Sequence, residues 1–197
     1  MLSSIIIILL SALISACSIP ETKIYNLHVN ESGRSKNILY KKTDSSIAIH
    51  VEAPDYLAQP YIVTRTSPYE IKISKTAKWE SPPKRFIKQV LKKVFSESGY
   101  FDHVSLSQIK REGYYWLIVD LKRFELVEED AGFSGEVIMD VSLFDHEMNS
   151  VFMSTINRKK QIRNKDYRNL AAVLGTFIPE GLDEIKDTVI RNIQGQH

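Results

Sequence analysis

The most distinctive reactive group in this 197-residue chain is the thiol of Cys17, its only cysteine. One thiol cannot close a disulfide within the chain, and a metal site needs further ligands beside it, which Cys17 lacks. Cys17 follows an apolar run, Ile5–Leu10, and a stretch of small and apolar residues that ends at Ala16. We therefore expect the chemistry of this thiol to depend on the N-terminal segment that precedes it.

The N-terminal segment is typical of a signal peptide that ends at an acylated cysteine. Its apolar run is shorter than the about 20 residues of a transmembrane helix, and small residues precede Cys17, as a signal peptidase requires. Leu13–Cys17 resembles a bacterial lipobox, in which the peptidase cuts before the cysteine and the thiol carries a diacylglycerol. We predict a lipoprotein signal peptide over residues 1–16, lipidation at Cys17 and a lipidated tether over 17–22. The alternative is an uncleaved anchor, and no Lys or Arg precedes the apolar run.

The other groups that could support catalysis or bind a metal are scattered. No two of the five histidines stand at the spacing of metal ligands. The eight glycines form no phosphate-binding loop, and no Gly-x-Ser-x-Gly motif is present. The adjacent carboxylates of residues 128–130 lie in a polar turn, where a solvated cluster is expected. We predict no catalytic site, no metal site and no cofactor, and hence no enzyme.

Basic residues are densest over residues 157–168. A solvated connection, a contact with lipid phosphates and a contact with an acidic protein all remain open for this segment. The net charge of +2 gives no general attraction to nucleic acid, and export would remove that partner. We predict no nucleic-acid binding.

The length of the mature chain fits one domain, which we expect over residues 23–195. Strands are expected near 24–29, at 46–52, 61–66 and 69–74, over 114–128 and 135–145, and at 150–162. One helix is expected between Ser81, as its cap, and Gly99. A second helical pattern runs from Asp166 to Ile193, and Pro179 with Gly181 should kink or split it.

Residues 47–95 resemble the ABC-type transport auxiliary lipoproteins, a family that includes a paraquat-inducible intermembrane-transport lipoprotein. The shared features are a strand followed by Pro54–Leu57, a strand that ends near Arg65, a strand with Tyr69, Trp79 followed by Pro82, and a helix with Leu91. Lys23–Leu27 is similar to the first strand of the family. The resemblance implies a single periplasmic α/β (α+β) domain with a mixed, mainly antiparallel sheet and two main helices packed on it.

The resemblance also implies a function. Family members act as auxiliary components of MCE/ABC-type intermembrane lipid transport systems, so we expect an MCE-domain protein as the partner. Ser18 after Cys17 is similar to an outer-membrane sorting signal, which implies a lipid-anchored docking subunit on the periplasmic face of the outer membrane. A homo-oligomer remains open. The alternatives are an outer-membrane lipoprotein that activates or scaffolds a cell-wall synthesis or envelope-assembly machine, and a lipid carrier with its own apolar cavity.

Within the segment that resembles the family, four residues are candidates for partner binding. Apolar and aromatic side chains in loops often form the energetic centre of an interface. The candidates are Asp55, Tyr56, Leu57 and Trp79. The alternative for Trp79 is a core residue ahead of the helix.

Overall fold

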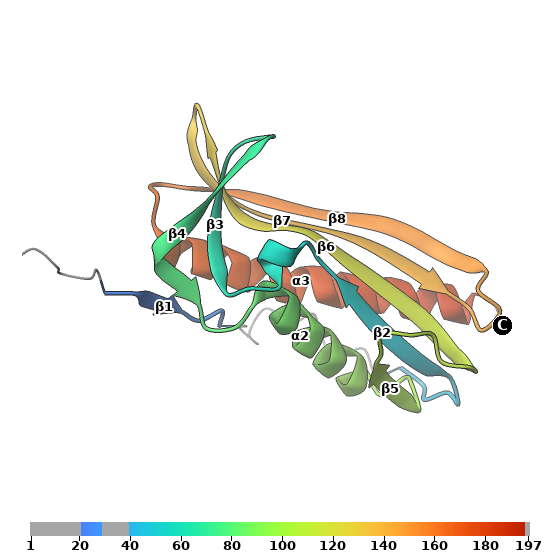
Figure 1. Cartoon of the computed structure of the whole chain (residues 1–197). Helices are drawn as coiled ribbons and strands as arrows, with labels where there is room; N and C mark the ends of the chain where they lie inside the picture. The colour runs from blue at the N-terminus through green and yellow to red at the C-terminus, as the bar shows by residue number, and fades with distance from the viewer. Residues whose placement is uncertain (1–20, 29–39, 196–197) are drawn as a thin grey trace, which may run out of the picture.

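The structure is a computed structural model that describes residues 21–28 and 40–195 (Figure 1). The predicted lipidation site Cys17 lies outside these residues. In chain order the elements are β1 (Lys23–Tyr25), β2 (Ser46–Glu52), the 3-10 helix η3 (Asp55–Leu57), β3 (Tyr61–Ser67), β4 (Glu70–Trp79), α2 (Pro83–Glu97), β5 (His103–Leu106), β6 (Tyr114–Glu129), β7 (Gly132–Phe144), β8 (Ser150–Ile162) and α3 (Tyr167–Gln194).

The long strand β6 organises an eight-stranded sheet. Along one edge it pairs with antiparallel β7, and β8 continues the sheet beyond β7. Along the other edge, the first half of β6 pairs with parallel β2. Near its other end, β6 pairs with β3, where Thr64 and Arg65 lie opposite Leu126 and Val127. β4 and then β1 continue the sheet beyond β3, and β5 continues it beyond β2. The expected mixed, mainly antiparallel sheet is therefore confirmed.

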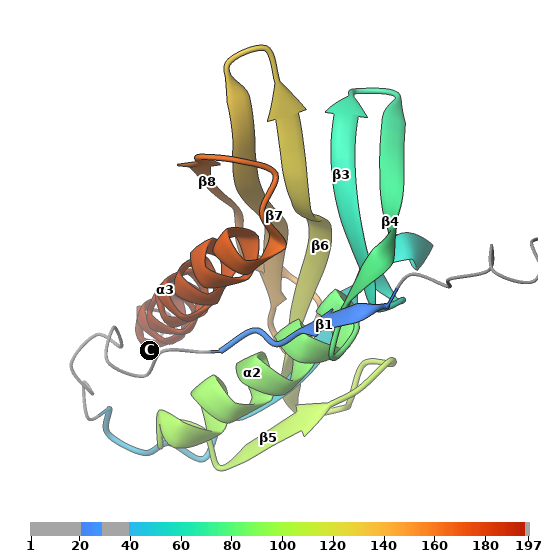
Figure 2. The same cartoon turned by 90° about the vertical axis from the view of Figure 1, so that its left-hand side faces the viewer.

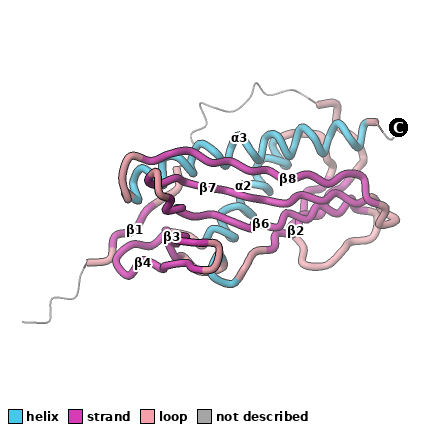
Figure 3. The backbone as a smooth tube through the Cα atoms, turned by 90° about the horizontal axis from the view of Figure 1, so that it is seen from above, coloured by secondary structure: helices cyan, strands magenta, loops and turns pink. Residues whose placement is uncertain are grey.

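Both helices lie on the same face of this sheet, and the opposite face is left uncovered (Figures 2 and 3). The core forms between the helices and the facing side chains of the strands, with Leu117, Val119 and Leu121 of β6 fully buried. On the helices, residues three and four apart align on one side, which produces the apolar stripe that packs on the sheet. The buried members of these stripes are Ile87, Val90, Leu91, Val94 and Phe95 of α2, and Leu170, Leu174, Ile178, Leu182, Ile185, Val189, Ile190 and Ile193 of α3.

The helix boundaries differ in two respects from the sequence prediction. α2 is capped by Pro82 rather than Ser81, without a side-chain hydrogen bond, whereas Gly99 has the positive φ of 65° expected of a residue just beyond a helix. α3 runs without interruption through Pro179, so the expected split is wrong. A proline inside a helix costs about 3 kcal/mol, but apolar side chains on both sides of Pro179 pack on one sheet, and this burial outweighs the cost.

Candidate docking site

Two hairpins extend beyond the part of the sheet that the helices cover (Figure 2). The β3–β4 hairpin turns after Ser67, and the β6–β7 hairpin turns after Glu129. Because β3 and β6 are paired only at Thr64 and Arg65, the two hairpins separate beyond this point. An open cleft of about 500 Å³ lies between them, which we call the hairpin cleft. Its lining residues are Arg65, Thr66, Ser67, Pro68, Arg123, Val127, Glu128, Glu129, Asp130, Glu136 and Lys159.

A network of paired charges supports the hairpin cleft from the uncovered face of the sheet. The carboxylate of Glu125 is fully buried and accepts two hydrogen bonds from Arg65, from Nε at 2.5 Å and from Nη2 at 3.1 Å. Arg123 places its Nε 3.8 Å from the same carboxylate and donates from Nη1 to Glu136 at 2.8 Å. The hydrogen bond to Glu125 raises the pKa of Arg65. A buried charge is tolerated when it is paired in this way, so the network fixes β3 against β6 and β7.

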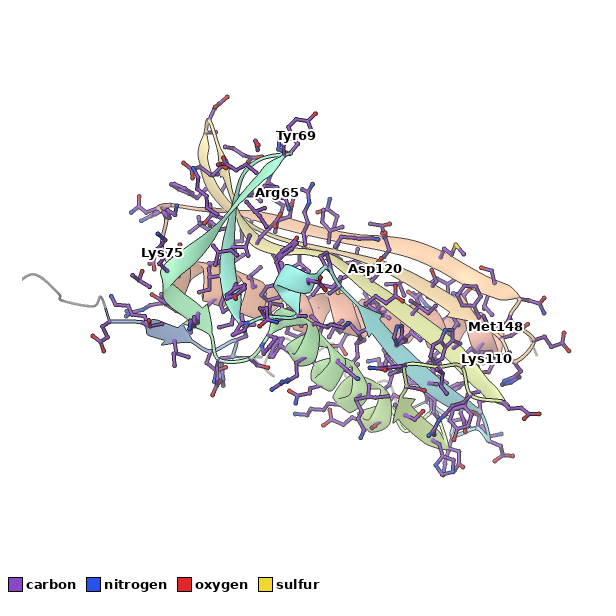
Figure 4. The ribbon with its side chains drawn as sticks, in the orientation of Figure 1. Arg65, Tyr69, Lys75, Lys110, Asp120 and Met148 are labelled. Atoms are coloured by element: carbon purple, nitrogen blue, oxygen red, sulfur yellow. The ribbon has the colours of Figure 1, made fainter. Side chains whose placement is uncertain are left out.

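The rim of the hairpin cleft carries further charges and one aromatic ring. Lys159 on β8 pairs with Glu129 at 2.5 Å. At the other tip, the side chain of Tyr69 is 98% exposed and projects into solvent (Figure 4). Its backbone N–H donates to Ser67 Oγ at 3.2 Å, which holds the turn that presents the ring. Tyrosine rings of this kind are frequent at the centres of protein interfaces.

Tyr56, one of the four predicted partner-binding residues, borders this charged network. Its hydroxyl donates to the carbonyl oxygen of Lys122 on β6 at 3.3 Å. Partial burial raises the pKa of Tyr56, the charge of Glu125 adds to this effect, and the charges of Arg65 and Arg123 oppose it. Asp55 is exposed beside it. Both side chains therefore remain accessible for a partner.

The structure corrects the prediction for Leu57 and Trp79. Leu57 is fully buried and Trp79 is only 2% exposed, so neither side chain is available at the surface of this chain. β4 extends to Trp79, and its ring meets that of Phe124 edge to face, with centroids 5.6 Å apart. The alternative reading of Trp79 as a core residue is therefore right, and the same holds for Leu57.

Neither the charged network nor the exposed ring of Tyr69 was predicted from the sequence. A signal was present, because Arg123 and Glu125 are two residues apart on a strand and thus share a face. What the sequence lacked was the parallel pairing that brings Arg65 from a distant strand onto Glu125.

Two histidines pack on aromatic rings, His50 of β2 and His146 in the turn after β7, whereas His103 of β5 is exposed and places its Nε2 3.1 Å from the carboxylate of Asp102. His50 stacks on Trp116 with ring centroids 5.6 Å apart, and His146 lies 4.5 Å from the ring of Tyr115. Over residues 21–28 and 40–195, no group of three or more His, Cys, Asp or Glu side chains could hold a metal ion. None of the helices in this part of the chain is long and apolar enough to cross a membrane.

Comparison with known families gives the decisive observation. The family model for the ABC-type transport auxiliary lipoprotein component matches residues 25–186. The chain belongs to this family. The resemblance noted over residues 47–95 thus extends over nearly the whole described domain. Membership makes the chain an auxiliary lipoprotein component of ABC-type transport.

Solved structures share the fold. A crystal structure from Xanthomonas campestris, assigned to the DUF330 family, has a TM-score of 0.75 and 18% identity, and the match covers 88% of this chain and 98% of that one. A crystal structure of an uncharacterised protein has a TM-score of 0.62 and 16% identity, with 86% of this chain and 99% of that chain covered. At these identities the likeness concerns the fold alone. No curated protein sequence matches this chain.

Proposed function

We propose that this protein is an outer-membrane-anchored periplasmic lipoprotein that docks an MCE-domain protein within an ABC-type intermembrane lipid transport system. The observation that carries the proposal is the family match over residues 25–186. The lipobox-like sequence before Cys17 supports a lipid anchor, and Ser18 supports sorting to the outer membrane. The protein acts by binding rather than by catalysis.

The hairpin cleft, together with Tyr56 and Tyr69, is the surface that we assign to docking. Its floor is held by the bidentate pair of Arg65 and Glu125, so a partner would meet a surface that is already organised. Preorganisation lowers the entropy that binding costs. The ring of Tyr69 supplies apolar contact area at the tip, and Asp55 with Tyr56 extends the surface along β6.

The test is capture of envelope proteins from detergent-solubilised membranes by the lipidated full chain. We expect an MCE-domain protein in the captured fraction. Tyr69→Ser should reduce capture about tenfold or more, as loss of an interface aromatic does. Met153→Ser is the matched control, because Met153 is also an exposed apolar side chain but lies on β8 away from the cleft. Capture of a cell-wall synthase without any MCE protein would favour the alternative function.

A further inference from the structure

The position at which the chain leaves the domain toward Cys17 is fixed by contacts of β1. β1 pairs with the end of β4, and the carbonyl oxygen of Tyr25 accepts from the backbone N–H of Glu80 at 2.8 Å. The ring of Tyr25 meets that of Tyr167, the first residue of α3, with centroids 6.0 Å apart. β1, the end of β4 and the start of α3 therefore form one end of the domain, on the left in Figure 1.

The spacing in the sequence limits how far this end can lie from a lipid on Cys17. Glu21, the first described residue, stands four positions after Cys17. A fully extended chain spans at most about 3.6 Å per residue, so the two Cα atoms are no more than about 14 Å apart. If Cys17 is acylated, the bilayer surface must lie within a short distance of β1.

The surface at this end combines an exposed aliphatic side chain with basic residues. Ile24 is 71% exposed, although it lies in a strand, and it stands in register with Lys78 of β4. Lys75 projects at the same end (Figure 4). β1, the end of β4, the connection from β8 to α3 and the first turn of α3 carry the following exposed residues, which we call the anchor-side face: Lys23, Ile24, Lys75, Lys78, Arg163 and Arg168.

The basic residues of the anchor-side face are available for an external anion. Within the part of the chain that the structure describes, none of the five has a carboxylate within ion-pair distance. The acidic residues nearby are Glu21, Glu80, Glu128 and Asp166. The carboxylate of Asp166 already accepts the backbone N–H of Arg168 at 2.8 Å, and the carboxylate of Glu128 lies 4.0 Å from Lys165. Positive charge therefore predominates at this end.

We propose that the anchor-side face lies directly on the bilayer that holds the lipid of Cys17, with its Lys and Arg side chains on anionic phospholipid headgroups and Ile24 at the edge of the acyl region. Basic residues close to an anionic surface strengthen binding, and a lipid anchor combined with a basic patch is a recurrent pairing. The proposal rests on the lipid anchor of the proposed function. It assigns a role to Arg163 and Arg168 of the basic segment 157–168. Arg163 directly follows Ile162, which pairs with Phe133 of the β6–β7 hairpin, and the tips of both hairpins project away from β1 (Figures 1 and 2).

Two single-cysteine variants of the lipidated full chain test the orientation. Acylation occupies Cys17, so Ile24→Cys introduces one reactive thiol for an environment-sensitive fluorophore. Ile109→Cys is the matched control, because Ile109 is 75% exposed and adjoins Lys110 at the opposite end of the molecule (Figure 4). Both proteins are reconstituted into vesicles of phosphatidylethanolamine and phosphatidylglycerol that contain a lipid-borne quencher. We expect quenching at position 24 to exceed that at position 109 several-fold.

A charge comparison completes the test. In the Ile24→Cys background, Arg163→Gln with Arg168→Gln should reduce quenching at least twofold. Lys41→Gln with Lys92→Gln removes the same charge from exposed sites elsewhere and should leave quenching unchanged. Equal quenching at positions 24 and 109 in protein that floats with the vesicles would show that the anchor-side face does not lie on the bilayer, although the protein is anchored by its lipid. Protein that carries no lipid by mass spectrometry and does not float would contradict both the lipid anchor at Cys17 and the contact of the anchor-side face with the bilayer. An equal loss in both charge variants would overturn the role of the two arginines.

Discussion

Gly175 of α3 and His28, beyond β1, are in direct backbone contact: a Cβ atom built on Gly175 would lie 2.8 Å from the carbonyl oxygen of His28. Real Cβ atoms essentially never approach another heavy atom so closely. A glycine is therefore required at position 175 for the N-terminal segment to pack against the helix.

We predict opposite effects of alanine at the two buried glycines of α3. Alanine favours a helix over glycine by about 1 kcal/mol, and at position 181 its Cβ would make only ordinary contacts, the nearest at 3.5 Å with Ile156. Gly181→Ala should leave the free energy of unfolding unchanged or raise it. Gly175→Ala should lower it by about 1–3 kcal/mol because of overpacking. Urea denaturation of both variants measures the difference, and equal stabilities would contradict the contact with His28.

Leu57 should contribute to stability rather than to binding. It is fully buried in η3, so Leu57→Ala should lower the free energy of unfolding by about 2–5 kcal/mol through lost burial and a residual cavity. The neighbouring Asp55→Ala, at an exposed position, should change it by no more than about 0.5 kcal/mol. Chemical denaturation tests both. A Leu57→Ala protein as stable as wild type would show that the core does not depend on this turn.

The pair of Arg65 and Glu125 should show strong coupling. Arg65→Met leaves a fully buried carboxylate, with Arg123 3.8 Å away as its remaining partner, and should cost about 3–5 kcal/mol. Glu125→Gln in the same protein removes the charge and should restore a substantial part of the loss. A double-mutant cycle on the free energy of unfolding gives the coupling. Simple additivity of the two changes would mean that the pair does not act as a unit.

Tyr40 should make the fold less stable at high pH. Burial and the hydrogen bond from its hydroxyl to Asp187 at 2.7 Å raise the pKa of Tyr40 to about 12, against about 10 in the unfolded chain. Between these values the unfolded chain loses a proton that the folded chain keeps, so the free energy of unfolding falls as pH rises. Tyr40→Phe should flatten this fall.

Melting temperatures at about pH 9 and pH 11 provide the measurement for Tyr40. Some slope should remain in Tyr40→Phe, because the pKa values of Tyr56, Tyr100 and Tyr115 are also raised, chiefly by burial. Asp187→Asn should flatten the slope in part, since it removes the charge that the hydroxyl of Tyr40 faces. An unchanged slope in Tyr40→Phe would show that this hydroxyl does not titrate differently in the folded protein.

Local patterns were sufficient to predict most elements. The alternation over 46–52 gives β2 with the predicted bounds, and the four-residue spacing of apolar side chains identifies the buried stripes of both helices. Both strands of the β3–β4 hairpin were also predicted, at 61–66 and 69–74, and they pair with each other as neighbours in the sequence. Signals of this kind depend only on neighbours along the chain.

Features that depend on distant partners were not predictable in this way. Leu57 stands in a short proline-bounded segment that reads as an exposed turn, and only tertiary packing makes it part of the core. Pro179 carries a strong local signal for a break, which tertiary packing overrides. The pairing of Arg65 with Glu125 joins residues that are 60 positions apart, and no local pattern encodes it.

The shared edge of β6 has a consequence for the order in which the fold can form. Synthesis delivers β2 and β3 first, yet the edge on which both pair is complete only when residue 129 has been made. Until then, β3 can pair with β4 and β2 with β5, but the edge of each strand that faces β6 lacks its native partner. Contacts between such distant segments form slowly. During this interval β2 and β3 of the nascent chain can pair with wrong strands. Completion of β6 then supplies the missing partner of both strands at the same time.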